Sequence, residues 1–171
     1  CNQGANLAET EFLLFLNPDA QLQPGAVAGL EAAMDRYPKA SAMNPRISEA
    51  DGSPYFKRRS VLLPRKDHMP RGWPTTDAEV TVLSGAALFV RRAAFKSVGG
   101  FDPQIFLYHE DDDLSLRLRT ECGPLMFIPK SHKRGTLAAG HDKGTTSYPL
   151  WTLDNDVITR STPEKSLTEP L

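Results

Sequence analysis

Five consecutive apolar residues, Phe12–Leu16, run directly into Asn17-Pro18-Asp19-Ala20. An uninterrupted apolar run of this length is typical of a strand covered on both faces in a largely parallel sheet. Pro18 restricts the backbone immediately before Asp19, so the carboxylate has a defined direction at the end of the strand. Open α/β sheets bind their ligands outside the carboxyl ends of their strands. The run therefore predicts an α/β fold with Asp19 at a binding edge.

A second acidic motif, Glu110-Asp111-Asp112-Asp113, precedes a helix predicted from about Leu114 to Glu121. Carboxylates suit the positive end of a helix dipole. Capping alone needs one of them, Asp112 or Asp113. The others repel one another unless a cation, a substrate or a proton balances their charge. The motif therefore indicates at least one carboxylate with a further function, and a carboxylate is suited to accept a proton from a hydroxyl as a general base.

Two features between these motifs also point to a site. The segment from Val80 to Val90 is apolar except for Thr81 and Ser84-Gly85, and a glycine inside a strand pattern indicates close approach of a ligand or of another backbone. The segment from Leu63 to Asp77 is rich in proline and charge and is typical of a loop. Trp73 within it has two open interpretations, a lid over a ligand or a local packing anchor.

Bulk properties limit the class of protein. The chain has 171 residues, 40% of them hydrophobic and 24% charged, which fits one globular domain with a core. A net charge of -1 leaves no electrostatic footprint for nucleic acid. Cys1 and Cys122 form no CxxC pattern, which favours free thiols in a reducing, cytoplasmic setting. No apolar run approaches the roughly 20 residues that span a bilayer.

Six stretches, in their order and approximate spacing, resemble the family 2 inverting glycosyltransferases, especially their bacterial rhamnosyltransferase-like branch. They lie between about Asn2 and Ser147 and read FLLFLNPDA, PGAVAGLEAAM, DGSPYFKRRS, VLSGAALFVRRAAFKSVGGFD, FLYHEDDDLSLRLR and HDKGTTS. The resemblance implies the GT-A fold, a single αβα layered domain with a mostly parallel sheet. Residues 1–150 would be its catalytic portion, and residues 151–171, rich in Thr, Glu, Lys and Pro, are expected to form a poorly ordered tail.

The resemblance also implies an activity. The enzyme would move a sugar, with inversion, from a nucleotide-diphosphate donor to a hydroxyl of a glycan or lipid-linked acceptor, in bacterial envelope polysaccharide synthesis. Asp111 resembles the catalytic base, and Glu110 would orient the acceptor. Ser84-Gly85-Ala86 would lie along the floor of the site near the acceptor and the donor sugar.

A divalent metal, Mg²⁺ or Mn²⁺, is the implied cofactor. Asn17-Pro18-Asp19 resembles the DxD motif of the family with Asn in its first position, so Asn17 and Asp19 would face the donor. Asp19 would bind the ion that bridges the donor diphosphate, and His141 resembles the histidine that completes the metal site.

One departure concerns the amino terminus. Family members begin with a strand and a helix that bind the nucleotide, and this sequence starts after them at Cys1. We therefore expect an amino-terminally truncated domain that binds donor weakly or not at all, and that either is less stable than a full domain or self-associates through an exposed sheet edge. A cytoplasmic location with peripheral association at the inner face of the membrane is a further expectation.

Two alternative functions stay open at this point. The first is a non-catalytic fragment that binds a sugar nucleotide or a glycan. The second is a metal-dependent phosphohydrolase that uses the acidic cluster.

Overall fold

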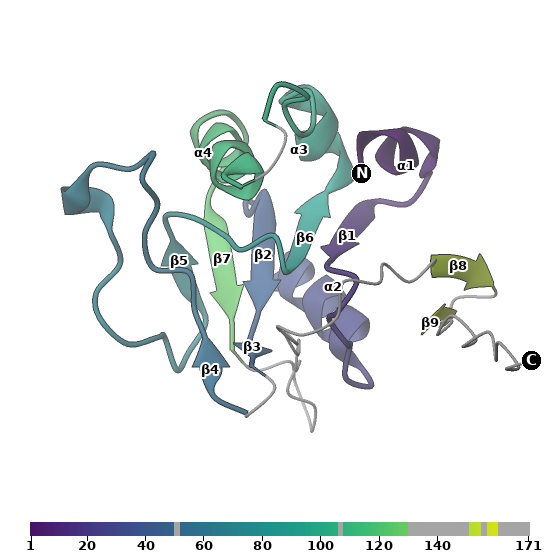
Figure 1. Ribbon diagram of the computed structural model, residues 1–171, viewed down its shortest axis with the longest axis horizontal. Helices are drawn as coiled ribbons and strands as arrows, with labels where there is room; N and C mark the ends of the chain where they lie inside the picture. The colour runs from purple at the N-terminus through teal and green to yellow at the C-terminus, as the bar shows by residue number, and fades with distance from the viewer. Residues whose placement is uncertain (50–51, 106–107, 130–150, 155–156, 161–171) are drawn as a thin grey trace, which may run out of the picture. The chain divides into compact units, whose positions relative to one another are not determined.

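The structure is a computed structural model that describes residues 1–49, 52–105, 108–129, 151–154 and 157–160. The chain divides into two compact units, Cys1–His141 and Asp142–Leu171 (Figure 1). Among the described residues, no helix is both long enough and apolar enough to cross a membrane.

A five-stranded sheet forms the centre of the first unit, in the order β1-β6-β2-β7-β5. β2 and β7 pair in parallel, whereas β6 is antiparallel to β1 and to β2, and β5 is antiparallel to β7. The α/β class is as expected, but the sheet is more mixed than expected because β6 lies between β1 and β2 and runs opposite to both. The strands are Phe12–Leu16 (β1), Ala42–Pro45 (β2), Ala78–Val80 (β5), Ala87–Arg91 (β6) and Leu125–Ile128 (β7).

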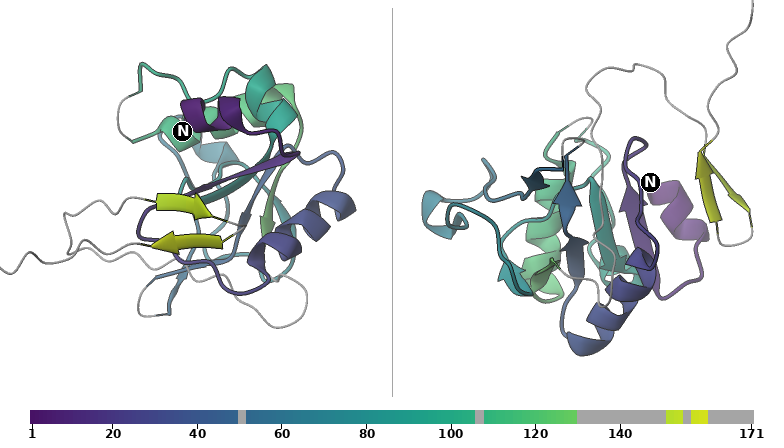
Figure 2. Two further views of the ribbon diagram at one scale, coloured as in Figure 1. Left: turned by 90° about the vertical axis from the view of Figure 1, so that its right-hand side faces the viewer. Right: turned by 90° about the horizontal axis from the view of Figure 1, so that it is seen from below.

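Helices cover both faces of this sheet, α1, α3 and α4 on one and α2 on the other (Figures 1 and 2). Each face therefore has its own apolar core, and the expected αβα layering is confirmed. The helices are Asn2–Leu7 (α1), Ala26–Arg36 (α2), Arg92–Ser97 (α3) and Glu110–Glu121 (α4).

Side-chain alternation along the strands explains why both faces are apolar. In β6, Leu88 and Val90 pack in the core under α1, α3 and α4, whereas Phe89 between them packs in the core under α2. Ala42 and Met43 of β2 divide in the same way. Successive strand residues point to opposite faces, so a continuous apolar run is what a doubly covered sheet requires.

Smaller elements surround the sheet. Ile47–Ser48 (β3) pairs with Pro54–Tyr55 (β4), and a long loop with one 3-10 turn, Arg65–Asp67 (η1), continues to β5. Trp73 in this loop packs against the core, and the guanidinium carbon of Arg46 lies 4.9 Å from its ring centroid. The structure thus supports the packing interpretation of Trp73.

Two observations bear on the ends of the domain. β1 is an edge strand of the sheet that the described residues form, and self-association through this edge stays a prediction. In the second unit, Trp151–Asp154 (β8) and Val157–Arg160 (β9) form an antiparallel hairpin. Composition had predicted a poorly ordered tail over residues 151–171 and did not anticipate these strands. The remainder of that segment lies outside the described residues.

Candidate active site

The end of β1 places the first acidic motif beside the turn that precedes β6. Leu16 is paired with Ala87, and one residue further the Asn17 amide donates a 3.1 Å hydrogen bond to the Ala86 carbonyl. The Ala20 amide donates back to the Asn17 carbonyl at 3.0 Å and closes a tight turn. Asp19, partly buried, lies within this turn. The carboxylate is therefore at the carboxyl end of its strand, as the sequence predicted.

The same β5–β6 turn binds the second acidic motif. The Gly85 amide donates a 2.7 Å hydrogen bond to Oδ2 of Asp111. A Cβ atom added at Gly85 would lie 3.2 Å from Cβ of Asp111. A close approach does occur at Gly85, but the neighbour is the Asp111 side chain and not the ligand or backbone that the sequence pattern indicated. Three segments far apart in sequence, around Asp19, Gly85 and Asp111, meet at one end of the sheet.

Buried polar side chains hold this turn in place. Asn44 of β2 accepts from the Ser84 amide at 2.6 Å and donates to the carbonyls of Ser84 and Ala87 at 2.9 and 2.7 Å. Ser115 of α4 accepts from the Leu83 amide at 3.0 Å. Buried polar groups need such partners, and here the partners are backbone groups on either side of Gly85. The sequence analysis did not anticipate either Asn44 or Ser115.

The backbone that enters α4 is unusual. Tyr108 and His109 both have positive φ, 62° and 67°. Non-glycine residues rarely adopt this region, and such strain concentrates at functional sites. His109 is the N-cap residue of α4 but makes no side-chain capping bond. The amide of Asp112 is instead bonded by Oδ1 of Asp111 at 2.8 Å, so the expectation that Asp112 or Asp113 caps the helix is wrong.

Asp112 and Asp113 each pair with a side chain on or next to α4. Asp113 accepts a 3.0 Å hydrogen bond from Nε of Arg117, one turn later in α4. Asp112 is 3% exposed and bonds Nδ1 of His109 at 3.0 Å. Burial raises the pKa of Asp112, but the hydrogen bonds from His109 and Lys57 outweigh it, and the net pKa is lowered. Asp112 is therefore a buried anion that organises its surroundings.

Lys57 is the cation that balances this cluster. Its Nζ lies 2.7 Å from Oδ2 of Asp111 and 2.8 Å from Oδ1 of Asp112, and its side chain is 17% exposed. Burial lowers the pKa of Lys57, but the interactions with the two carboxylates raise it further than burial lowers it. The ammonium group is therefore charged at neutral pH. Sequence analysis missed Lys57, because a lysine within a basic run normally indicates a solvated surface.

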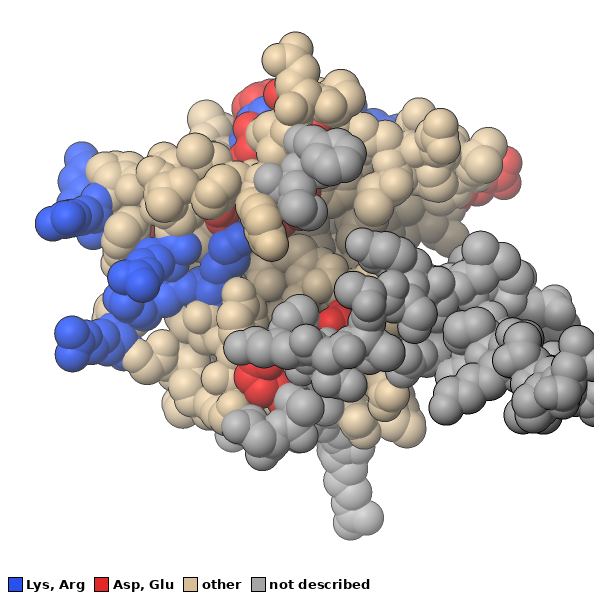
Figure 3. Space-filling view, viewed as in Figure 1, with Lys and Arg blue, Asp and Glu red and all other residues tan. Residues whose placement is uncertain are grey.

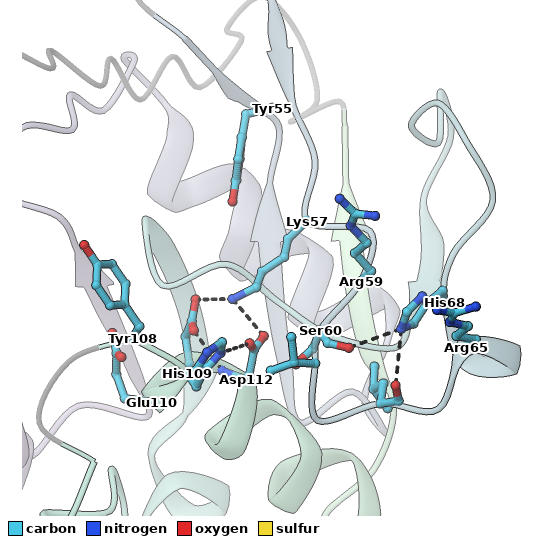
Figure 4. A pocket seen from close by; sticks show the side chains of 13 residues that line it. Tyr55, Lys57, Arg59, Ser60, Arg65, His68, Tyr108, His109, Glu110 and Asp112 are labelled. Atoms are coloured by element: carbon cyan, nitrogen blue, oxygen red, sulfur yellow. Dashed lines mark hydrogen bonds and ion pairs between the residues drawn. The ribbon is translucent and has the colours of Figure 1, made fainter.

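These groups line a cavity of about 750 Å³. Figure 4 shows Tyr108, His109, Glu110 and Asp112 on one side of it, with Arg59, Arg65 and His68 on the other and Lys57 between them. Oε2 of Glu110 is buried and has no hydrogen-bond partner among the residues that the structure describes. An unpaired buried carboxylate oxygen is costly, and because Oε2 is closed to solvent, a ligand hydroxyl reaches it only if the Glu110 side chain moves.

The structure describes only one of the two predicted metal ligands, Asp19. His141 lies outside the described residues, so its meeting with Asp19 stays a prediction. No group of three or more His, Cys, Asp or Glu side chains that could hold a metal occurs within the described part of the chain. Asp19 alone fits Mg²⁺ or Mn²⁺ chemistry, because these ions bind oxygen and often use one or two carboxylates together with substrate phosphates.

A known family matches the sequence of the chain. The family model described as Glycosyl transferase family 2 matches residues 1–99, a range that includes the end of β1 and the Gly85 turn. The chain belongs to glycosyl transferase family 2.

Two curated relatives of the chain are rhamnosyltransferases. The chain is 34% identical over 156 residues to the N-acetylglucosaminyl-diphospho-decaprenol L-rhamnosyltransferase of Mycobacterium tuberculosis, which covers 77% of the chain and 51% of that protein. It is 27% identical over 137 residues to Rhamnosyltransferase WbbL of Escherichia coli, which covers 73% of the chain and 52% of that protein. The resemblance to rhamnosyltransferase-like family 2 glycosyltransferases is therefore confirmed. The chain spans about half the length of these curated relatives.

A solved structure gives the fold. The crystal structure of GalNAc-T7 with UDP, GalNAc and Mn²⁺ matches with a TM-score of 0.58 at 18% identity, covering 81% of this family 2 chain and 29% of that chain. At this identity the likeness concerns the fold alone, and it agrees with the expected GT-A-like architecture.

Proposed function

We propose that this chain carries the acceptor side and part of the donor side of an inverting glycosyltransferase site. The reaction moves a sugar, rhamnose by analogy with the named relatives, from a nucleotide diphosphate to a hydroxyl of a lipid-linked sugar. The observation that carries the proposal is the placement of Asp111. Its carboxylate lines the cavity and is fixed by the Gly85 amide, the Asp112 amide and Lys57.

The hydrogen bonds of Asp111 support Oδ1 as the proposed base. Oδ2 already accepts from the Gly85 amide and from Lys57, both at 2.7 Å. Oδ1 accepts from the Asp112 amide and keeps a second lone pair. We assign the acceptor hydroxyl to that lone pair, because general-base transfer needs a direct hydrogen bond between base and hydroxyl.

The bond changes follow from this assignment. The acceptor oxygen forms a bond to the anomeric carbon of the donor sugar as its proton passes to Oδ1 of Asp111. The bond between the anomeric carbon and the diphosphate oxygen breaks, and its electron pair leaves with the nucleoside diphosphate. Glu110, which lines the cavity, accepts a hydrogen bond from a second acceptor hydroxyl. The positive charge of Lys57 offsets the electrostatic repulsion between the carboxylates of Asp111 and Asp112.

The donor diphosphate is assigned to the turn after β1. Asp19 would hold a divalent cation there, with His141 as its further predicted ligand. Such a cation, when bound, neutralises charge on the departing diphosphate. Asn17, Ser84 and Ala86 are proposed to border the donor sugar. The Asn17–Ala86 hydrogen bond joins their turn to the segment of Asp19, and the Gly85–Asp111 hydrogen bond joins it to the base.

The decisive experiment replaces Asp111 by Asn in the protein as encoded and measures transfer of radiolabelled sugar together with donor affinity. We expect turnover to fall by about two to four orders of magnitude with little change in donor affinity, because shape is kept and basicity is lost. Asp113→Asn is the matched control, since Asp113 is paired with Arg117 outside the cavity.

Three outcomes would count against the proposal. Near-normal turnover in Asp111→Asn would exclude Asp111 as the base. Donor binding by the wild-type protein without any transfer would favour a non-catalytic sugar-nucleotide-binding role. Phosphate release that needs no acceptor would favour a phosphohydrolase.

A further inference from the structure

The loop that follows β4 combines unpaired cations with exposed aliphatic side chains. We refer to Arg58–Met69 as the basic loop. Within it, Val61 is 78% exposed and Leu62 is 46% exposed. Arg59 and Arg65 line the cavity, and no carboxylate of the described residues lies within ion-pair distance of either guanidinium group. One short segment thus presents exposed aliphatic side chains together with guanidinium groups that have no carboxylate partner among the described residues.

Hydrogen bonds fix the shape of the basic loop. At its neck, the Met69 amide donates to the Arg58 carbonyl at 2.9 Å, and the Arg58 guanidinium donates to the Met69 carbonyl at 3.1 Å. Inside the loop, Nε2 of His68 lies 3.1 Å from the Ser60 carbonyl and 3.3 Å from the Leu63 carbonyl. Carbonyls only accept, so Nε2 carries the proton. A loop held in this way loses little conformational entropy when a ligand binds.

The charges in the cavity are unevenly distributed. Lys57 is neutralised by Asp111 and Asp112, whereas Arg59 and Arg65 lie on the opposite side of the cavity in Figure 4, without a carboxylate partner in the described ranges. Figure 3 shows Lys and Arg side chains gathered on the left of the molecule, where the loop after β4 runs in Figure 1. A neutral sugar at Asp111 does not account for two guanidinium groups across the cavity that have no carboxylate partner among the residues that the structure describes.

We propose that Arg59 and Arg65 form a subsite for the diphosphate of a lipid-linked acceptor, and that Val61 and Leu62 contact the first part of its lipid chain. The guanidinium fork matches phosphate oxygens in a bidentate geometry. Exposed aliphatic groups next to it favour an alkyl chain attached to that phosphate. This inference rests on the proposed function, because the sugar of the same acceptor would reach Asp111 across the cavity.

The test uses a short, water-soluble prenyl diphosphate, citronellyl diphosphate, titrated calorimetrically into the protein. Citronellol and inorganic diphosphate serve as probes for the two halves of the ligand. We expect the double variant Arg59→Gln/Arg65→Gln to bind citronellyl diphosphate at least tenfold more weakly. We expect Val61→Ser/Leu62→Ser to weaken citronellyl diphosphate severalfold and to leave inorganic diphosphate unchanged.

Matched controls come from the same loop and its surroundings. Lys66→Gln and Arg71→Gln remove one exposed positive charge each outside the cavity lining, and we expect less than a twofold change. Circular dichroism melting checks folding, which exposed substitutions should leave intact. A double variant that binds citronellyl diphosphate as tightly as the wild type overturns the proposal. Equal losses in the two charge controls overturn it too, because they indicate attraction by overall charge.

Binding to lipid vesicles distinguishes a specific diphosphate subsite from a general contact with the membrane surface. If the arginine variants lose only binding to phosphatidylglycerol vesicles and keep citronellyl diphosphate, the loop is a bilayer contact and the subsite assignment is wrong. Asp111→Asn is expected to bind citronellyl diphosphate normally. If Asp111→Asn stays active while the arginine variants lose the ligand, the subsite stands and the assigned base is wrong, so the two failures are distinguishable.

Discussion

The Gly85 amide and Oδ2 of Asp111 are joined by a 2.7 Å hydrogen bond that crosses from the turn before β6 to the first turn of α4. The Ala86 carbonyl, next in the chain, accepts from Asn17 at the end of β1. One turn therefore ties the proposed base to the strand that carries Asp19. The position of the Asp111 carboxylate therefore depends on the backbone of the Gly85 turn as well as on the conformation of the Asp111 side chain.

Gly85→Ala tests this dependence. The added Cβ would lie 3.2 Å from Cβ of Asp111 and 3.4 Å from its Oδ2, so the carboxylate must shift by a few tenths of an ångström. We expect turnover to fall about tenfold or more, while the free energy of unfolding falls by about 1 kcal/mol. Gly4→Ala in α1 is the control, because nothing lies within 4 Å of its new Cβ, and alanine there should stabilise by roughly 0.5–1 kcal/mol. Normal turnover in Gly85→Ala would show that the turn does not position the base.

Lys57→Met tests the charge balance of the cluster. Asp111 and Asp112, with side chains 15% and 4% exposed, would face each other without their shared cation. Breaking such a pair from one side costs about 3 kcal/mol of unfolding free energy at neutral pH, measured by urea denaturation. Lys66→Met, on the exposed η1 turn, should stay within about 0.5 kcal/mol of the wild type. Adding Asp112→Asn to Lys57→Met should recover part of the loss, and further destabilisation would contradict this account.

The pH dependence of stability follows from the same two residues. The pKa of Asp112 is lowered from its ordinary 3.8, so its contribution is present above that value and is lost as pH falls through the folded pKa. The pKa of Lys57 is raised from 10.5, so its contribution is present below that value and is lost as pH rises through the folded pKa. Melting temperature measured against pH should decline at both ends. Asp112→Asn should flatten the acid limb, and an unchanged acid limb would contradict the assignment.

Glu110→Gln separates acceptor orientation from structural support. Oε2 of Glu110 is buried and unpartnered within the described ranges, so replacing the carboxylate by a neutral amide should not lower the melting temperature. The acceptor KM should rise severalfold because an acceptor oxygen for a substrate hydroxyl is lost, whereas the donor KM should stay constant. A fall in melting temperature with unchanged acceptor KM would make Glu110 a structural residue.

The predictable part of the site comes from strand ends. Phe12–Leu16 stops at Asn17, and a glycine interrupts the Val80–Val90 segment, so Asp19 and Gly85 could be placed at a binding edge from local pattern alone. The antiparallel insertion of β6 was not predictable in the same way, because an apolar run gives no strand direction. Asn44 and Lys57 also gave no local signal. Their importance arises from partners about 40 and 54 residues away.

The four acids of α4 illustrate the same limit. Their sequence indicated that at least one carboxylate has a function beyond capping. It did not show which carboxylate has which partner. Arg117 engages Asp113, His109 and Lys57 engage Asp112, and Gly85 engages Asp111. Only Arg117 and His109 are near neighbours in sequence. The division of roles therefore depends on tertiary contacts that periodicity does not encode.

The neck between Arg58 and Met69 has a consequence for how such proteins diversify. Because two hydrogen bonds between these residues close the loop at its base, exposed residues between Arg59 and His68 can change while both ends of the segment stay fixed. Lys57, immediately before the neck, remains with the carboxylates. The exposed positions of the segment, such as Arg59, Val61 and Leu62, can therefore differ between relatives with different acceptors while buried Ser60 keeps its hydrogen bond to Asp112.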